Sequence, residues 1–167
     1  MYDELTKVDI EKMKAEIEYR RNELRPKLIE EVKVARGFGD LSENFEYKAA
    51  KREKNQNDSR IRYLERVIKT AVVIEDTSGA DEVGLFDTVT VFLEDEKTEE
   101  VFRIVTTLRQ NPLQGLISKE SPIGSSLMGH QVGDVVHVQV NETFGYDAKI
   151  IKIEKGTDDE DLPISRY

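Results

Sequence analysis

The chain of 167 residues contains no cysteine and no tryptophan. Without cysteine, a disulfide framework, a zinc–thiolate site and a thiol nucleophile are all excluded. No apolar run approaches the roughly 20 residues that a membrane-spanning helix needs. The acidic start Met1-Tyr2-Asp3-Glu4 lacks the apolar core of a signal peptide. We therefore expect a cytoplasmic protein that makes no contact with a membrane.

Charge is abundant but unevenly distributed along the chain. Residues 1–76 hold 17 basic and 17 acidic side chains, whereas residues 77–167 hold 8 and 17, so the net charge of −9 belongs to the second half. An acidic surface repels phosphates, which argues against nucleic-acid binding there. The first half has two basic clusters, which either contact nucleic acid or are ordinary solvated helix faces: Arg20, Arg21, Arg25 and Lys27, and Lys48, Lys51, Arg52 and Lys54.

The first half has the pattern of two long helices. A helix start is predicted at Thr6, with Asp9 three residues later. Apolar residues then recur in steps of three and four, Arg20 interrupts them, and Pro26 predicts a kink or a local loosening of the helix. A second helix is expected to begin near residues 40–42 and to end near Thr70. Two helices of almost 30 residues, about 40–45 Å long, predict an antiparallel coiled coil that is most apolar at its base.

The second half alternates between apolar and polar residues, as half-buried strands do. Strands are predicted at 87–93, 101–105, 135–140 and 146–153, with a hairpin turn at 95–98. One short helix is expected from Ser121 as N-cap, through Pro122 at its first position, to Gly129. The class is therefore α+β, with a coiled-coil domain at 1–76 and a second domain at 77–167. We expect the acidic tail, from about residue 156, to be mobile.

The predicted hairpin tip carries Asp40, Glu43 and Glu46 beside the turn. Carboxylates suit a hard cation such as Mg²⁺, but two of them make only part of a site. The spacing of Asp40 and Glu43 also fits a helix N-cap and its third residue, and spacing alone favours that structural interpretation. His130 and His137 lack a partner at metal-ligand spacing and are interpreted as structural or surface residues.

Two motifs resemble the bacterial Gre transcript cleavage factors of the GreA type. The first comprises Ala35-Arg36, Gly39-Asp40-Leu41-Ser42-Glu43-Asn44, Glu46-Tyr47 and Ala49-Ala50-Lys51; the second comprises Ser121-Pro122-Ile123-Gly124, Leu127-Met128-Gly129 and Val132-Gly133-Asp134-Val135-Val136. The resemblance extends from about Thr6 to Glu154. Phe45 and Lys48 depart from it, standing where alanine and histidine are expected, and the chain continues beyond the usual end.

The resemblance implies a coiled coil followed by an FKBP-like domain, in a monomeric factor that acts on RNA polymerase and is not itself an enzyme. It implies that the coiled coil enters the secondary channel and stimulates cleavage of the nascent RNA in a backtracked complex. Asp40 and Glu43 would then share a Mg²⁺ ion with the polymerase, because two metals stabilise both the attacking and the leaving oxygen.

Other roles follow from the same resemblance. Asn44, Glu46 and Tyr47 would support the tip or contact RNA, Arg52 would contact the transcript, and Ser121, Pro122 and Ile123 would dock on the polymerase. A Gre-like protein that occupies the channel without stimulating cleavage is the main alternative. A prolyl isomerase is disfavoured because such a pocket needs aromatic side chains, and residues 119–140 contain neither phenylalanine nor tyrosine.

Overall fold

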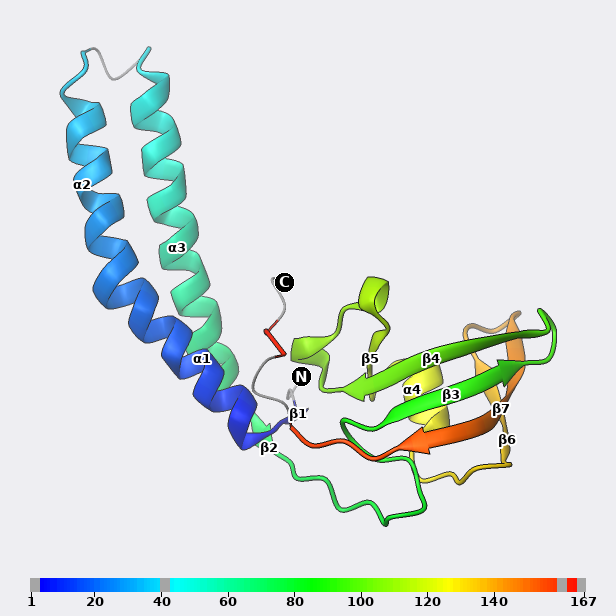
Figure 1. Cartoon of the computed structure of the whole chain (residues 1–167). Coiled ribbons are helices and arrows are strands. Elements are labelled where there is room, and N and C mark those ends of the chain that lie inside the picture. The colour runs from blue at the N-terminus through cyan, green and yellow to red at the C-terminus, as the bar shows by residue number, and fades with distance from the viewer. Residues whose placement is uncertain (1–3, 40–42, 159–161, 165–167) are drawn as a thin grey trace. The chain divides into compact units, whose positions relative to one another are not determined.

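The computed structural model describes residues 4–39, 43–158 and 162–164, which form two compact units (Figure 1). One unit is a helical hairpin of residues 10–71. The other contains the segment Glu4–Asp9 together with the chain from Val72 onward. The sequence pattern did not indicate that residues 4–9 would pack with the second unit.

The hairpin consists of α1 (Lys7–Tyr19) and α2 (Arg25–Arg36) on one arm and α3 (Phe45–Thr70) on the other. The predicted apolar stripe is confirmed, because its buried members are Met13, Ile17, Leu28 and Ala35 on the first arm and Ile61, Leu64 and Val67 on the second. The predicted helix start is also confirmed. Thr6 Oγ1 accepts the Asp9 N–H at 3.2 Å, and the Asp9 carboxylate accepts the Thr6 N–H at 3.0 Å.

The first arm changes its helical geometry just before Pro26. Residues Arg20–Leu24 form a π-helical turn, and the Arg25 N–H donates to the Arg20 carbonyl five residues back. Proline has no N–H to donate, so it fits best in the first turn of α2, where a donor would lack a helical partner. The predicted local loosening of the arm is thus present as a π-helical turn.

The second arm begins later than predicted. Asn44 is the N-cap of α3, and its Oδ1 accepts the Tyr47 N–H at 3.0 Å. The expected start at residues 40–42 is wrong, and so is the interpretation of Asp40 as the N-cap with Glu43 at the third helical position. Asn44 caps the helix because its side-chain oxygen reaches the backbone N–H of Tyr47, three residues later. Asp40 itself lies outside the described residues.

The second unit is built on a sheet with the strand order β5-β4-β3-β7-β6. Its strands are β3 (Thr88–Leu93), β4 (Thr98–Val105), β5 (Leu116–Ser118), β6 (Val135–Gln139) and β7 (Gly145–Glu154). All neighbours are antiparallel except β4 and β5. The four predicted strands are confirmed, whereas the three-residue β5 was missed because so short a segment has no readable alternation.

Helix α4 (Pro122–Leu127) supplies Leu127 to the main core of the sheet, beside Val89, Val91 and Ile150. As predicted, Ser121 caps this helix, and its Oγ accepts the Gly124 N–H at 3.1 Å. Two further strands, β1 (Glu4–Leu5) and β2 (Val72–Val73), pair in parallel. The predicted α+β class, with a long helical hairpin and a small FKBP-like α+β unit, is confirmed.

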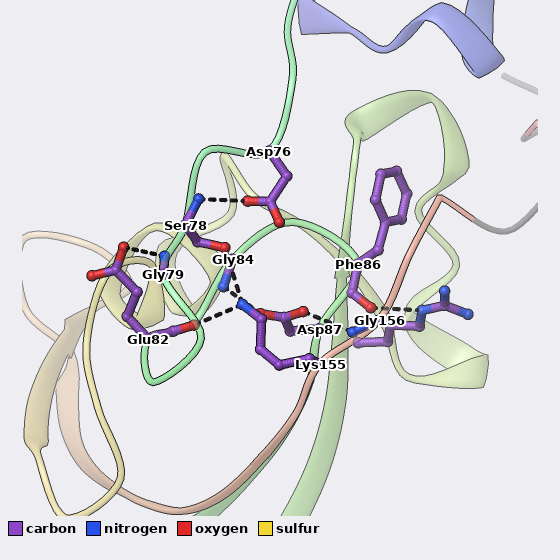
Figure 2. A network of polar contacts seen from close by, with 10 residues as sticks. Asp76, Ser78, Gly79, Glu82, Gly84, Phe86, Asp87, Lys155 and Gly156 are labelled. Carbon is purple, nitrogen blue, oxygen red and sulfur yellow. Dashed lines mark hydrogen bonds and ion pairs between the residues drawn. The ribbon is translucent and has the colours of Figure 1, made fainter.

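The start of the acidic tail makes several contacts with the second unit in the described residues, and its expected mobility stays a prediction. Figure 2 shows Gly156, whose N–H donates to buried Asp87 at 2.9 Å, and Lys155, whose Nζ lies 2.5 Å from the same carboxylate. Lys155 also donates to Ser78 Oγ and to the Glu82 carbonyl, both at 3.0 Å. Further along, Leu162 packs on the second apolar cluster, which is formed by Leu85, Phe86, Val105 and Leu116. The described part of the tail therefore has both polar and apolar contacts with the second unit.

Within the part of the chain that the structure describes, none of the helices combines the length and the apolar character needed to cross a membrane.

Candidate functional site at the hairpin tip

The described tip presents its acidic side chains to solvent. Glu43 and Glu46 are exposed, and they line a groove of about 530 Å³ together with Phe38, Asn44 and Phe45. An exposed carboxylate is well hydrated and keeps its oxygens available to an incoming cation. Among the described residues, no group of three or more acidic or histidine side chains can hold a metal ion. A metal at Glu43 would therefore need most of its ligands from elsewhere.

Asn44 connects the two arms of the hairpin below the loop. While its Oδ1 caps α3, its Nδ2 donates to the Ala35 carbonyl at 2.6 Å, close to the C-terminal end of α2. One side chain thus satisfies a donor at the start of one helix and an acceptor near the end of the other. This contact holds Glu43, the neighbouring residue, at a defined place on the hairpin.

Two basic side chains lie against the ring of Tyr47, near the start of α3. The Arg36 guanidinium lies 5.4 Å from the ring centroid, and the Lys51 ammonium lies 6.0 Å from it. The Arg36 side chain hydrogen-bonds the phenol, and Lys51 adds its charge, so the pKa of Tyr47 is lowered from its usual value. Tyr47 therefore positions basic groups from both arms, while Arg52 on α3 is exposed.

A buried polar layer crosses the hairpin between its apolar base and its tip. Asn57 and Arg60 on α3 are only 3% and 5% exposed. The Arg20 side chain donates to Asn57 Oδ1 at 2.9 Å, and Asn57 Nδ2 donates to the Arg20 carbonyl at 3.2 Å. That carbonyl belongs to the π-helical turn. Such paired buried groups fix which residues of the two arms lie opposite one another.

Glu16 completes this layer by accepting from Arg60 Nε at 2.8 Å and from Arg20 Nε at 3.0 Å. Partial burial raises the pKa of Glu16, but the hydrogen bonds and charges of Arg60 and Arg20 outweigh it, so the pKa of Glu16 is lowered. The sequence pattern did not predict this layer. Its signals were polar residues on the apolar stripes, Arg20 on the first arm and Asn57 on the second.

The three residues expected to dock on a polymerase lie together at the start of α4. Ser121 caps the helix, Pro122 is exposed, and Ile123 packs partly against the main core. Two of the three therefore have structural contacts within the second unit, and Pro122 presents the exposed surface. His130 and His137 are exposed and lie 3.3 Å from Asp134 and 2.8 Å from Asp147, which confirms them as surface residues.

Comparison with known proteins shows what class this arrangement belongs to. Residues 4–73 match the family model described as transcription elongation factor, N-terminal, and residues 77–155 match transcription elongation factor, GreA/GreB, C-term. The helical hairpin and the α+β unit are thus the two parts of a transcription elongation factor. The chain belongs to the GreA/GreB family.

Individual relatives cover nearly the whole chain. Transcription elongation factor GreA of Geobacillus kaustophilus is 46% identical over 136 residues, which are 81% of this chain and 86% of the relative. The GreA of Macrococcus caseolyticus is 39% identical over 89% of this chain and 94% of its own length. A solved structure of the transcription factor Gfh1 is 26% identical, with a TM-score of 0.45, and covers 92% of this chain and 97% of that one.

Proposed function

We propose that this chain binds bacterial RNA polymerase as a cytoplasmic monomer and stimulates the polymerase's own cleavage of backtracked RNA. The hairpin enters the secondary channel and carries its tip to the active site, which rescues arrested complexes. The observation that carries this proposal is the exposed Glu43 carboxylate, set beside the capping residue Asn44 at the end of a long arm. A carboxylate in that position adds nothing to the hairpin core.

The chemistry needs a second molecule, because Asp40 and Glu43 are too few ligands for a magnesium site. The polymerase supplies the remaining ligands, and a Mg²⁺ ion bound there would stabilise the oxygens that attack and leave. In this arrangement Glu43 helps to hold and orient the Mg²⁺ ion, while the polymerase cuts the phosphodiester bond. The chain is therefore a stimulating factor and not an enzyme by itself.

Other residues of the hairpin and the second unit support this role. Asn44 fixes the start of α3, Tyr47 arranges Arg36 and Lys51, and Glu46 lines the groove beside Glu43. Arg52 contacts the transcript phosphates in this proposal, and its exposure on α3 supports that role. Ser121, Pro122 and Ile123 at the start of α4 dock on the polymerase.

The test is a cleavage assay on a stalled, backtracked transcription complex with radiolabelled RNA. Asp40→Asn and Glu43→Gln keep size and polarity but are poor Mg²⁺ ligands, so each should lower the rate of RNA shortening by at least about 10- to 100-fold. Glu53→Gln, at an exposed position further along α3, is the matched control and should cleave normally.

The alternatives separate clearly in this assay. Normal shortening with both tip variants would rule out the metal role. If the unmodified protein blocks RNA extension without shortening the transcript, it is a channel occupant that modulates the polymerase without cleavage.

A further inference from the structure

Two phenylalanine rings stand in solvent at the hairpin tip. Phe38 is 66% exposed and Phe45 is 79% exposed, and both line the groove that contains Glu43. Burying one such side chain stabilises a fold by about 1.5–3 kcal/mol, and most of that gain is not realised here. Neither ring therefore has a large role in folding the described hairpin, which leaves a partner as the reason for their placement.

The neighbouring charges indicate the chemistry of that partner. Lys48 Nζ lies 5.8 Å from the Phe45 ring centroid, and Lys51 and Arg52 follow as exposed cations on α3. Exposed aromatic rings beside cations are typical of surfaces that bind single-stranded nucleic acid, where rings stack on bases and cations meet phosphates. An unpaired RNA strand has both features.

An apolar protein surface fits this groove less well. Glu43 and Glu46 line the groove with the two rings, and an apolar partner would bury both carboxylates without compensating hydrogen bonds. A nucleobase is flat and uncharged, so the carboxylates do not repel it. Its exocyclic amino groups can also donate to a carboxylate at its edge.

We propose that Phe38 and Phe45 form a stacking surface for an unpaired base near the 3′ end of the displaced RNA. This inference rests on the proposed function, because the RNA must reach the tip. Phe45 is the first residue of α3, directly after the capping residue Asn44, so its backbone is held by the cap. A base stacked on this ring lies in the same groove as Glu43, which positions the adjoining phosphodiester for cleavage.

Stacking is measured directly with 2-aminopurine as the displaced 3′ nucleotide of a backtracked complex, because stacking on an aromatic ring quenches its fluorescence. The unmodified protein should quench it, and so should Phe45→Tyr. Phe45→Ala, Phe45→Leu and Phe38→Ala should quench less. For Phe45→Ala and Phe45→Leu, the factor concentration that gives half-maximal cleavage should rise by at least about fivefold, the lower end of the range for base–aromatic stacking.

Val34→Ala is the matched control, since Val34 is a 53% exposed apolar residue on α2 that does not line the groove. It should behave as the unmodified protein does. Thermal unfolding followed by circular dichroism should be the same for all these variants, because the substituted side chains are exposed.

The stacking proposal and the cleavage proposal fail in different ways. Quenching by the unmodified protein and by Asp40→Asn supports stacking, even where cleavage is absent. Cleavage without quenching overturns it. Phe45→Leu acting as well as the unmodified protein in both measurements also overturns it, and identifies Phe45 as an apolar contact with the channel wall.

Discussion

Replacing Asp158 with asparagine should destabilise the second unit, because this carboxylate faces a buried arginine. Arg109 is only 1% exposed. Its Nε lies 2.6 Å from Asp9 Oδ1, and its Nη1 pairs with Asp158. Asp158 also accepts the Thr6 hydroxyl at 2.7 Å. The start of the acidic tail thus supplies a second carboxylate to a buried cation that also pairs with Asp9.

The expected loss in the free energy of unfolding follows from how deeply these charged groups are buried. A hydrogen bond to a charged group contributes about 1.5–3 kcal/mol. The Asp158 side chain is 19% exposed and Arg109 keeps Asp9 as a partner, so Asp158→Asn should lower the free energy of unfolding by about 1.5–3 kcal/mol. Asp9 is fully buried and also completes the helix cap at Thr6. Asp9→Asn should therefore cost more, about 3–5 kcal/mol.

Native-state hydrogen exchange is the suitable assay, because core amides report the opening free energy of the unit that contains them. Val89 and Val91 on β3 are fully buried and belong to the second unit. Their exchange should accelerate in Asp158→Asn and further in Asp9→Asn. Glu142→Gln, at an exposed position between β6 and β7, is the control and should leave exchange unchanged.

A loss below about 0.5 kcal/mol in Asp158→Asn, the range of ordinary surface substitutions, would refute the reasoning. The tail would then touch the second unit without stabilising it. The double variant tests the coupling, since two carboxylates that share Arg109 should give a loss that differs from the sum of the single losses.

Two further predictions concern the hairpin. Asn44→Ala should lower its stability by about 0.5–2 kcal/mol through the lost cap, while Asn44→Asp should lose less, because it keeps the acceptor for Tyr47 and loses only the donor to the Ala35 carbonyl; equal hydrogen exchange of the α3 amides in all three proteins would contradict this. Glu16 should make the hairpin acid-sensitive. Its pKa is lowered by folding, so its stabilising contribution is present above the unfolded value near 4.5 and is lost as the pH falls through the lower folded pKa. Urea denaturation compared with Glu16→Gln at several pH values measures this contribution, and parallel pH profiles for the two proteins would show that Glu16 makes none.

Local patterns predicted most of the regular structure. The apolar steps along both helices, the Thr6–Asp9 cap and the Ser121–Pro122 start of α4 depend on residues close together in sequence. The same is true of the alternation in β3, β4, β6 and β7. Such signals can be read from the chain because the physical cause lies within a few residues of its effect.

The missed features depend on contacts between distant residues. Buried Arg109 pairs with carboxylates at positions 9 and 158, and the sequence around residue 109 gives no sign of either partner. The polar layer similarly joins Glu16 to Arg60 and Arg20 to Asn57. At the tip, several residues were able to cap α3, and the choice of Asn44 depended on its additional bond to the Ala35 carbonyl. The groove shared by Phe38, Phe45 and Glu43 likewise required the structure.

The pairing of β1 with β2 has a consequence for how this chain can be rebuilt. Glu4 lies opposite Val72, and Leu5 lies opposite Val73. Neighbouring strands are about 4.8 Å apart, so the chain leaves for the hairpin and returns from it through adjacent backbone positions. Within the described chain, the hairpin is therefore an insertion into the second unit, between Asp9 and Val72. Because parallel strands need a crossover of about a dozen residues or more, a very short linker should not replace the hairpin, but arms of other lengths or with other tips could be grafted between Asp9 and Val72.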